Sequence, residues 1–109
     1  MLESKYQKHV IDKVRVMLPG AYVYPNDGNY IQGFPDITIL YKKRWATLEC
    51  KRDENSEHQP NQDYYVNQSP LSNNAMFVYP ENRKQVLKEL ERRYREWDST
   101  IINSTAYMP

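Results

Sequence analysis

The stretch GFPDITILYKKRWATLECK, residues 33–51, contains two runs of β-branched and aromatic residues separated by a short polar turn. Apolar side chains dominate both runs, and the three residues between them, at 42–44, are all basic. Two such runs joined by a polar turn are typical of a β-hairpin. The stretch therefore predicts two adjacent antiparallel strands, at 36–41 and 45–51.

The register of this hairpin decides which side chains share a face. A two-residue turn at 42–43 pairs the two residues that flank it, and a four-residue turn gives the same register. Counting back from the turn sets Asp36 opposite Glu49. Because side chains alternate along a strand, Lys51 falls on the same face as the two acids. The other face is apolar and consists of Ile37, Ile39, Ala46, Leu48 and Cys50.

Two acids and a lysine on one face suit metal-dependent hydrolysis of a phosphodiester. Mg²⁺ prefers oxygen ligands and takes one or two carboxylates, which Asp36 and Glu49 supply. Lys51 is placed to orient or deprotonate the attacking water and to offset charge on the phosphate. An ordinary surface hairpin explains the same residues, and the hairpin alone does not separate the two interpretations.

The first helix offers a third acid. Residues 3–18 have helical periodicity, and the pair at 19–20, Pro-Gly, ends the run. Glu3 falls near the centre of the apolar stripe, beside Tyr6 and Val10. A carboxylate on a buried face needs a partner, a proton or a metal ion, which makes Glu3 a candidate ligand. Its place at a helix start has another explanation, because acids there interact favourably with the helix dipole.

The rest of the chain completes one small domain, at 1–98, with a C-terminal tail at 99–109. The tail contains Ile101 and Ile102 after the expected end of the last helix. An apolar tail is stabilised by folding back or by packing on a second subunit. The further elements predicted from periodicity and turn signals are a strand near 21–25, a helix at 60–68, a strand at 75–79 and a helix at 82–97.

Four of these features together resemble the PD-(D/E)XK nuclease superfamily. They are Glu3 on an opening helix, Gly33-Phe34-Pro35-Asp36 at a strand start, Glu49-Cys50-Lys51 at the end of the next strand, and Gln62 on a following helix. Within the superfamily, the chain is most similar to small phage-type VRR-NUC and Holliday-junction-resolvase nucleases. The resemblance runs from about residue 3 to residue 97. It implies an α/β, restriction-endonuclease-like αβββαβα core, with a small mixed sheet flanked by helices.

The resemblance also implies a metal centre. Asp36 and Glu49 would hold Mg²⁺, or Mn²⁺ in its place, together with the main-chain carbonyl of Cys50. Glu3 would join them directly or through water.

The same resemblance assigns catalytic roles to Asp36, Glu49 and two further residues. Lys51 would serve the attacking water, and Gln62 would complete the site from its helix. Gln59 competes with Gln62 for that role, so the resemblance leaves the site glutamine open.

Composition and charge bear on partners and location. The 109 residues include 15 basic and 14 acidic side chains, for a net charge of +1. Basic residues cluster around the hairpin, and such groups give salt-sensitive, largely sequence-independent DNA binding. The last helix is also basic, but its interleaved acids favour a solvated face. With no membrane-length apolar run, no signal-peptide pattern and one cysteine, a cytoplasmic protein is expected. The expected DNA contacts are Lys42, Lys43, Arg44 and Arg52.

These observations lead to three functional hypotheses. The first is a homodimeric, Mg²⁺-dependent endonuclease that is selective for branched DNA such as four-way junctions. The second is a sequence-specific nuclease of the homing or restriction kind, for which 109 residues leave little room. The third is a catalytically inactive DNA-binding module on the same fold, against which the presence of the acids and the lysine argues.

Overall fold

The described part of the chain forms three α-helices and four strands in the order α1, β1, β2, β3, α2, β4, α3. A computed structural model describes residues 3–27 and 31–103, with the backbone alone over 97–103. None of the described helices is long and apolar enough to cross a membrane. The elements are α1 Glu3–Met17, β1 Tyr22–Pro25, β2 Ile37–Tyr41, β3 Arg44–Cys50, α2 Pro60–Asp63, β4 Ala75–Val78 and α3 Arg83–Asn103.

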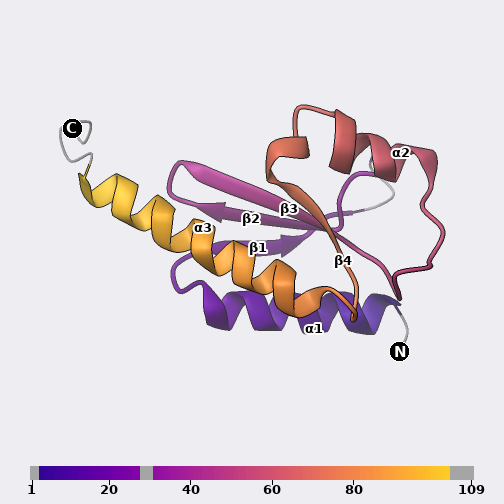
Figure 1. Cartoon of the computed structure of the whole chain (residues 1–109), viewed down its shortest axis with the longest axis horizontal. Coiled ribbons are helices and arrows are strands. Elements are labelled where there is room, and N and C mark those ends of the chain that lie inside the picture. The colour runs from indigo at the N-terminus through magenta and orange to yellow at the C-terminus, as the bar shows by residue number, and fades with distance from the viewer. Residues whose placement is uncertain (1–2, 28–30, 104–109) are drawn as a thin grey trace.

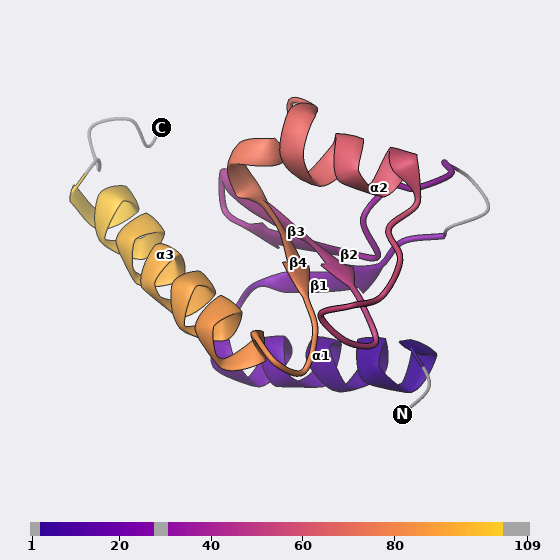
Figure 2. The ribbon, with the colours of Figure 1, turned by 45° about the vertical axis from the view of Figure 1, so that its right-hand side comes forward.

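The four strands make one mixed sheet in the order β1-β2-β3-β4. Strands β1, β2 and β3 pair antiparallel, and β4 runs parallel to β3. Helices α1 and α3 lie on one side of the sheet, and α2 lies over the other side with the π-helical turn Tyr64–Gln68 that continues it (Figures 1 and 2). The predicted α/β class with a small mixed sheet flanked by helices is confirmed.

The hydrophobic core fills the space between the sheet and the pair α1 and α3. The five residues of the predicted apolar hairpin face are all fully buried there. Helix α1 covers them because its apolar residues recur at steps of three and four, which places them on one stripe. The helices contribute Tyr6, Val10, Ile11 and Val14 from α1 and Val86 and Leu90 from α3.

The predicted register of the hairpin is also confirmed. Tyr41 pairs with Arg44 across a two-residue turn, and Ile37 pairs with Leu48. The turn is tight because Lys42 adopts a left-handed conformation, with φ of 54°. In this register the acids Asp36 and Glu49 face each other at the open end of the hairpin.

The expected end of the last helix was wrong. Helix α3 continues to Asn103, so Ile101 and Ile102 lie in its final turns and not after it. Thr100 and the two isoleucines lower helix propensity by only tenths of a kcal/mol each, about 0.7 at most. Without a proline or glycine to break it, the helix continues through them. The remainder of the expected tail, 104–109, lies outside the described residues.

Candidate metal centre

Three carboxylates from three separate elements meet at one end of the sheet. The oxygens of Glu3, Asp36 and Glu49 lie within 4.8 Å of one another. Helix α1 runs beneath the sheet so that its first turn lies where β2 begins and β3 ends, to the right in Figure 1. Hard divalent cations such as Mg²⁺ take oxygen ligands of this kind. The acids predicted to hold the metal are therefore brought together.

Glu49 is the buried member of the trio. Its side chain is 1% exposed, and its Oε2 atom finds no hydrogen-bond donor among the described residues. Its Oε1 atom accepts one long hydrogen bond, 3.4 Å, from Nε2 of Gln62. A buried carboxylate with an unsatisfied oxygen is costly unless a proton or a cation compensates it. A carboxylate buried in this way is not expected on an ordinary surface hairpin. The carboxylate oxygens of Glu3, Asp36 and Glu49 are ligands that fit a divalent cation.

The electrostatics of Glu49 point the same way. Burial, followed by the adjacent Asp36 carboxyl, raises the pKa of Glu49 to about 10, and Glu3 adds to this rise. The Lys51 ammonium lowers the pKa of Glu49, but by less. In the absence of a cation, Glu49 therefore holds its proton at neutral pH.

Asp36 is fixed by the backbone around it. Its Oδ2 atom accepts a 2.9 Å hydrogen bond from the amide of Cys50, which places the Cys50 main chain beside the acids. Its carbonyl accepts the amide of Asn26 at 2.7 Å. The Asn26 side chain also donates to the carbonyl of Pro35 and to the hydroxyl of Thr38, at 2.8 and 2.7 Å. Metal ligation through the Cys50 carbonyl stays a prediction.

Asn26 is a site-supporting residue that the sequence did not identify. It stands directly after β1 in a polar loop, where asparagine is ordinary. The only signal available was its position, at the end of the strand that pairs with β2. Antiparallel pairing brings that strand end level with the start of β2.

Glu3 reaches the trio in a different way from the one expected. Its side chain is exposed, although Tyr6 and Val10 on the same stripe are buried. The first turn of α1 extends past the end of the sheet (Figure 1), so the sheet does not cover the Glu3 side chain. The expectation of a buried acid is wrong, and the proximity of Glu3 to Asp36 and Glu49 depends on helix placement alone.

Lys51 lies inside the structure, beside the acids. It is 5% exposed, and its ammonium donates to the carbonyl of Glu57 at 3.0 Å and to Oε1 of Gln62. The same Gln62 oxygen accepts the amide of Gln59 at 2.9 Å. Gln62 therefore connects Lys51 to Glu49, and the structure places Gln62, not Gln59, in the site. An ammonium has three N–H donors, so one is left for a phosphate or a water.

The basic residues form two groups: exposed residues on and after the hairpin, and ion-paired residues on α3. Lys42, Lys43 and Arg44 are exposed at the turn of the hairpin, and Arg52 is exposed just after β3, near the acids. On α3, Arg92 and Arg93 pair with Glu89, which agrees with the expected solvated, ion-paired face.

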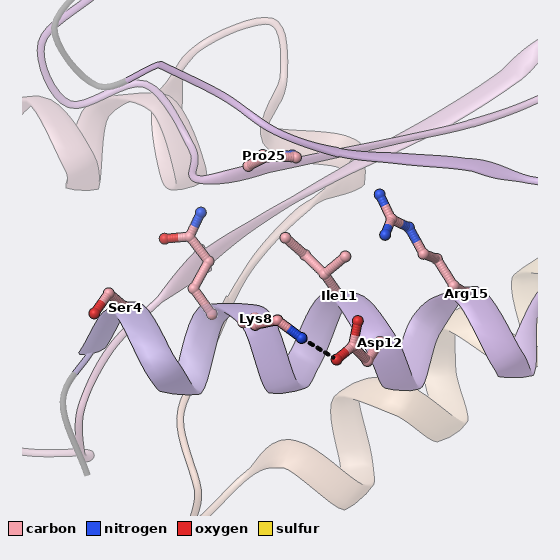
Figure 3. A pocket seen from close by; sticks show the side chains of 7 residues that line it. Ser4, Lys8, Ile11, Asp12, Arg15 and Pro25 are labelled. Atoms are coloured by element: carbon pink, nitrogen blue, oxygen red, sulfur yellow. Dashed lines mark hydrogen bonds and ion pairs between the residues drawn. The ribbon is translucent and has the colours of Figure 1, made fainter.

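A groove between α1 and the edge strand β1 lies next to the acids but outside them (Figure 3). Arg15 bridges it by donating to the carbonyl of Val23 at 2.9 Å, and Lys8 pairs with Asp12 at 3.0 Å. None of the seven lining residues belongs to the predicted site. The candidate site therefore lies at the strand ends and outside this groove.

Comparison with known proteins adds nothing to these observations: no family model, curated protein or solved structure matches the chain.

Proposed function

We propose that this chain is a metal-dependent endonuclease that hydrolyses phosphodiester bonds in DNA, on a restriction-endonuclease-like core of the PD-(D/E)XK kind. The observation that supports it most is the meeting of Glu3, Asp36 and Glu49 within 4.8 Å, with Lys51 and Gln62 bonded beside them. Acids and an ammonium at this spacing are the groups that phosphodiester hydrolysis needs. The observed element order and the parallel β3 and β4 pair are compatible with that core.

Mg²⁺ held by Glu3, Asp36 and Glu49, with the Cys50 carbonyl, would supply Lewis-acid polarisation of a phosphate oxygen and a more acidic water. Lys51 directs its remaining N–H toward the attacking water or the phosphate and offsets the negative charge that grows there. Gln62 holds the Lys51 ammonium in place through Oε1. Asp36 is oriented for its role by the amide of Cys50.

We further propose selectivity for branched DNA. Residues 3–27 and 31–103 form one small sheet flanked by helices and present no separate element for reading base edges. Their contacts with DNA then fall mainly on phosphates, which carry no direct sequence information. Discrimination then depends on the shape and deformability of the DNA. The exposed bases at 42–44 and Arg52 are the groups for these phosphate contacts.

The experiment is cleavage of labelled linear duplex, flap and four-way DNA with matched arms, in Mg²⁺ and in EDTA. The wild-type protein should cut the branched DNAs near the branch point and much faster than the duplex. Asp36→Asn and Glu49→Gln should abolish cleavage. Asp12→Asn and Glu91→Gln, which change acids paired on helix surfaces, should not alter it.

Each failure identifies a different error. Near-normal cleavage by both site variants would remove the metal-centre assignment. Equal cutting of linear duplex, or cutting at one defined sequence, would replace branch selectivity with the homing or restriction alternative. DNA binding without cleavage by the wild type would leave the inactive binding module.

A further inference from the structure

The sheet face that carries the acids continues as an exposed aromatic surface over β1 and β2. The register places Tyr22 opposite Leu40, and Leu40 opposite Trp45. Directly opposed residues share a face, so these three side chains form a row across the sheet. Tyr22 is 65% exposed and Leu40 is 39% exposed.

A second tyrosine extends this surface. Tyr24 is 44% exposed, and its ring stacks on that of Tyr22 with centroids 6.0 Å apart and planes 6° from parallel. Val23, between them, is 3% exposed and belongs to the core beneath the sheet. The alternation therefore directs both rings away from α1 and α3. We call the four side chains the aromatic face: Tyr22, Tyr24, Leu40 and Trp45.

The aromatic face and the acids Asp36 and Glu49 lie on the same face of the sheet. Asp36 and Leu40 are four residues apart on one side of β2, about 13 Å at the usual rise per residue. Trp45 and Glu49 are related in the same way on β3. Nearer the acids, Thr47 is 3% exposed, so the layer that includes α2 covers β3 there and leaves β1 and β2 open.

The other end of the aromatic face borders three cations. Lys42, Lys43 and Arg44 form the turn beyond Leu40 and Trp45, and all three are exposed. A strand crossing the face thus meets cations at one end and the acidic site at the other. The cations favour a polyanion, since an apolar protein partner would gain little from three positive charges at the rim.

We infer that the aromatic face binds unpaired bases of a nucleic acid strand, whose phosphates contact the basic turn. Bases stack on aromatic side chains whatever their sequence, and a groove of cations follows the backbone. Paired bases inside a duplex present no free ring face, so among branched DNAs the aromatic face favours those with a single-stranded segment beside the scissile phosphate, such as a flap. This inference rests on the proposed function for its direction toward the acids, but its binding test does not need cleavage.

The test measures fluorescence anisotropy of a labelled single strand of about 16 nucleotides, and of a blunt duplex of the same sequence, in EDTA. Tyr22→Ala and Tyr24→Ala should each weaken single-strand binding about 5- to 140-fold, the loss expected for one stacked base. Tyr22→Phe, which keeps the ring, should bind like the wild type. Val16→Ala is the matched control, because Val16 is 82% exposed on α1, which lies on the opposite side of the sheet.

Salt dependence separates stacking from charge. Tyr22→Ala should lower affinity without changing the slope of log affinity against log salt, whereas Lys43→Ala should reduce that slope by about 1. Equal affinity of the wild type for single strand and duplex, or wild-type single-strand binding by both alanine variants, would overturn the inference. So would conversion of a wild-type dimer to monomer by Tyr22→Ala in light scattering, since the face would then be a subunit interface.

The outcome is distinguishable from failure of the proposed function. If the wild type cuts DNA while the tyrosine variants bind single strands normally, only the inferred binding by the aromatic face is refuted. A protein that binds single strands through these tyrosines but never cuts refutes only the nuclease assignment.

Discussion

Glu49 is the residue whose energetics most constrain the candidate metal centre. A carboxyl that is 1% exposed, next to Asp36 and Glu3, must be either protonated or compensated by positive charge. The nearby Lys51 ammonium does not suffice, because the pKa of Glu49 stays raised at about 10. The free energy of unfolding of the metal-free protein should therefore fall as pH rises, because folding keeps Glu49 protonated while the unfolded chain releases the proton.

This difference in protonation predicts a pH-dependent stability. The pKa of Glu49 is about 10 in the folded protein, against 4.5 in the unfolded chain. Its contribution to folding stability is therefore complete below pH 4.5 and is lost as pH rises toward 10. In EDTA, the Tm of the wild type should fall between about pH 5 and pH 9 more steeply than that of Glu49→Gln. Mg²⁺ should raise the wild-type Tm more at the higher pH, since metal binding needs deprotonated ligands.

Thermal unfolding followed by circular dichroism gives both comparisons. Parallel pH profiles for the wild type and Glu49→Gln would show that Glu49 does not carry the raised pKa. Asp12→Asn serves as the control, because Asp12 is exposed in an ion pair on α1.

Lys51 is the residue expected to act on the attacking water or the phosphate. Lys51→Ala should slow cleavage of saturating DNA at least ~100-fold, the scale seen when a positioned acid-base or charge-stabilising group is lost. Mg²⁺ should still raise the Tm of this variant, because Asp36 and Glu49 remain. Lys43→Ala, at the exposed turn, should instead raise KM and leave kcat unchanged. A wild-type kcat for Lys51→Ala would exclude a role for the ammonium in the reaction.

At the scale of elements, a close contact between the loop before β2 and α2 sets the position of Gln62. Gly33 has φ of 81°, and a Cβ added there would lie 2.3 Å from Cβ of Asn61. Asn61 precedes Gln62 on α2, so the approach of this loop positions the helix that supplies the glutamine. A nearby edge-to-face contact of Phe34 with Tyr65, at 5.3 Å, packs the same two segments together.

Gly33→Ala should therefore affect both stability and activity. The left-handed conformation alone costs an alanine about 1–2 kcal/mol, and the clash with Asn61 adds to this cost by displacing α2. Gly20→Ala is the matched control, because Gly20 has φ of 88° but its added Cβ meets nothing closer than 3.6 Å. Gly33→Ala should lower both Tm and kcat, whereas Gly20→Ala should lower Tm alone. Equal effects of the two variants would contradict the proposed dependence of Gln62 on this contact.

At the scale of the whole molecule, the end of α3 extends beyond the sheet (Figure 1). Tyr94 makes the last described contacts with the body: its ring packs on Tyr41 at 4.4 Å, and its hydroxyl donates to the carbonyl of Pro19. In the sequence, the apolar residues Trp97 and Ile101 follow at a spacing of four, which is typical of a packing stripe on a helix. Burying such a stripe needs a second surface, which a second subunit can provide.

The proposed assembly is a homodimer with twofold symmetry, which would present two copies of the candidate metal centre, as paired incision of a symmetric junction would require. Light scattering at micromolar concentration should give twice the 13.1 kDa of one chain. Ile101→Glu should shift the protein to monomer, whereas Ser99→Glu, which changes a residue outside this apolar spacing, should not. A wild-type monomer would count against both the dimer and the role of α3 in it.

Patterns in the sequence were enough to predict the hairpin, its register and the separation of an apolar face from a face with Asp36 and Glu49. These properties depend on alternation and turn length, which are local and readable along the chain. The apolar stripe on α1 and the apolar strand at 75–79 could be predicted for the same reason. The end of α3 was not, because the residues at 97–103 disfavour a helix only weakly.

The positions of the predicted residues relative to one another depend on tertiary packing, which the sequence patterns did not reveal. In the folded protein Glu3 is exposed but lies beside the other acids, and Lys51 is buried. Gln62, and not Gln59, contacts Lys51 and Glu49 through its side chain, and Asn26 hydrogen-bonds to Asp36. These outcomes depend on where α1, α2 and β1 pack against the hairpin. Such packing is set by the fit of many side chains and by the Gly33 contact, so no local pattern in the sequence specifies it.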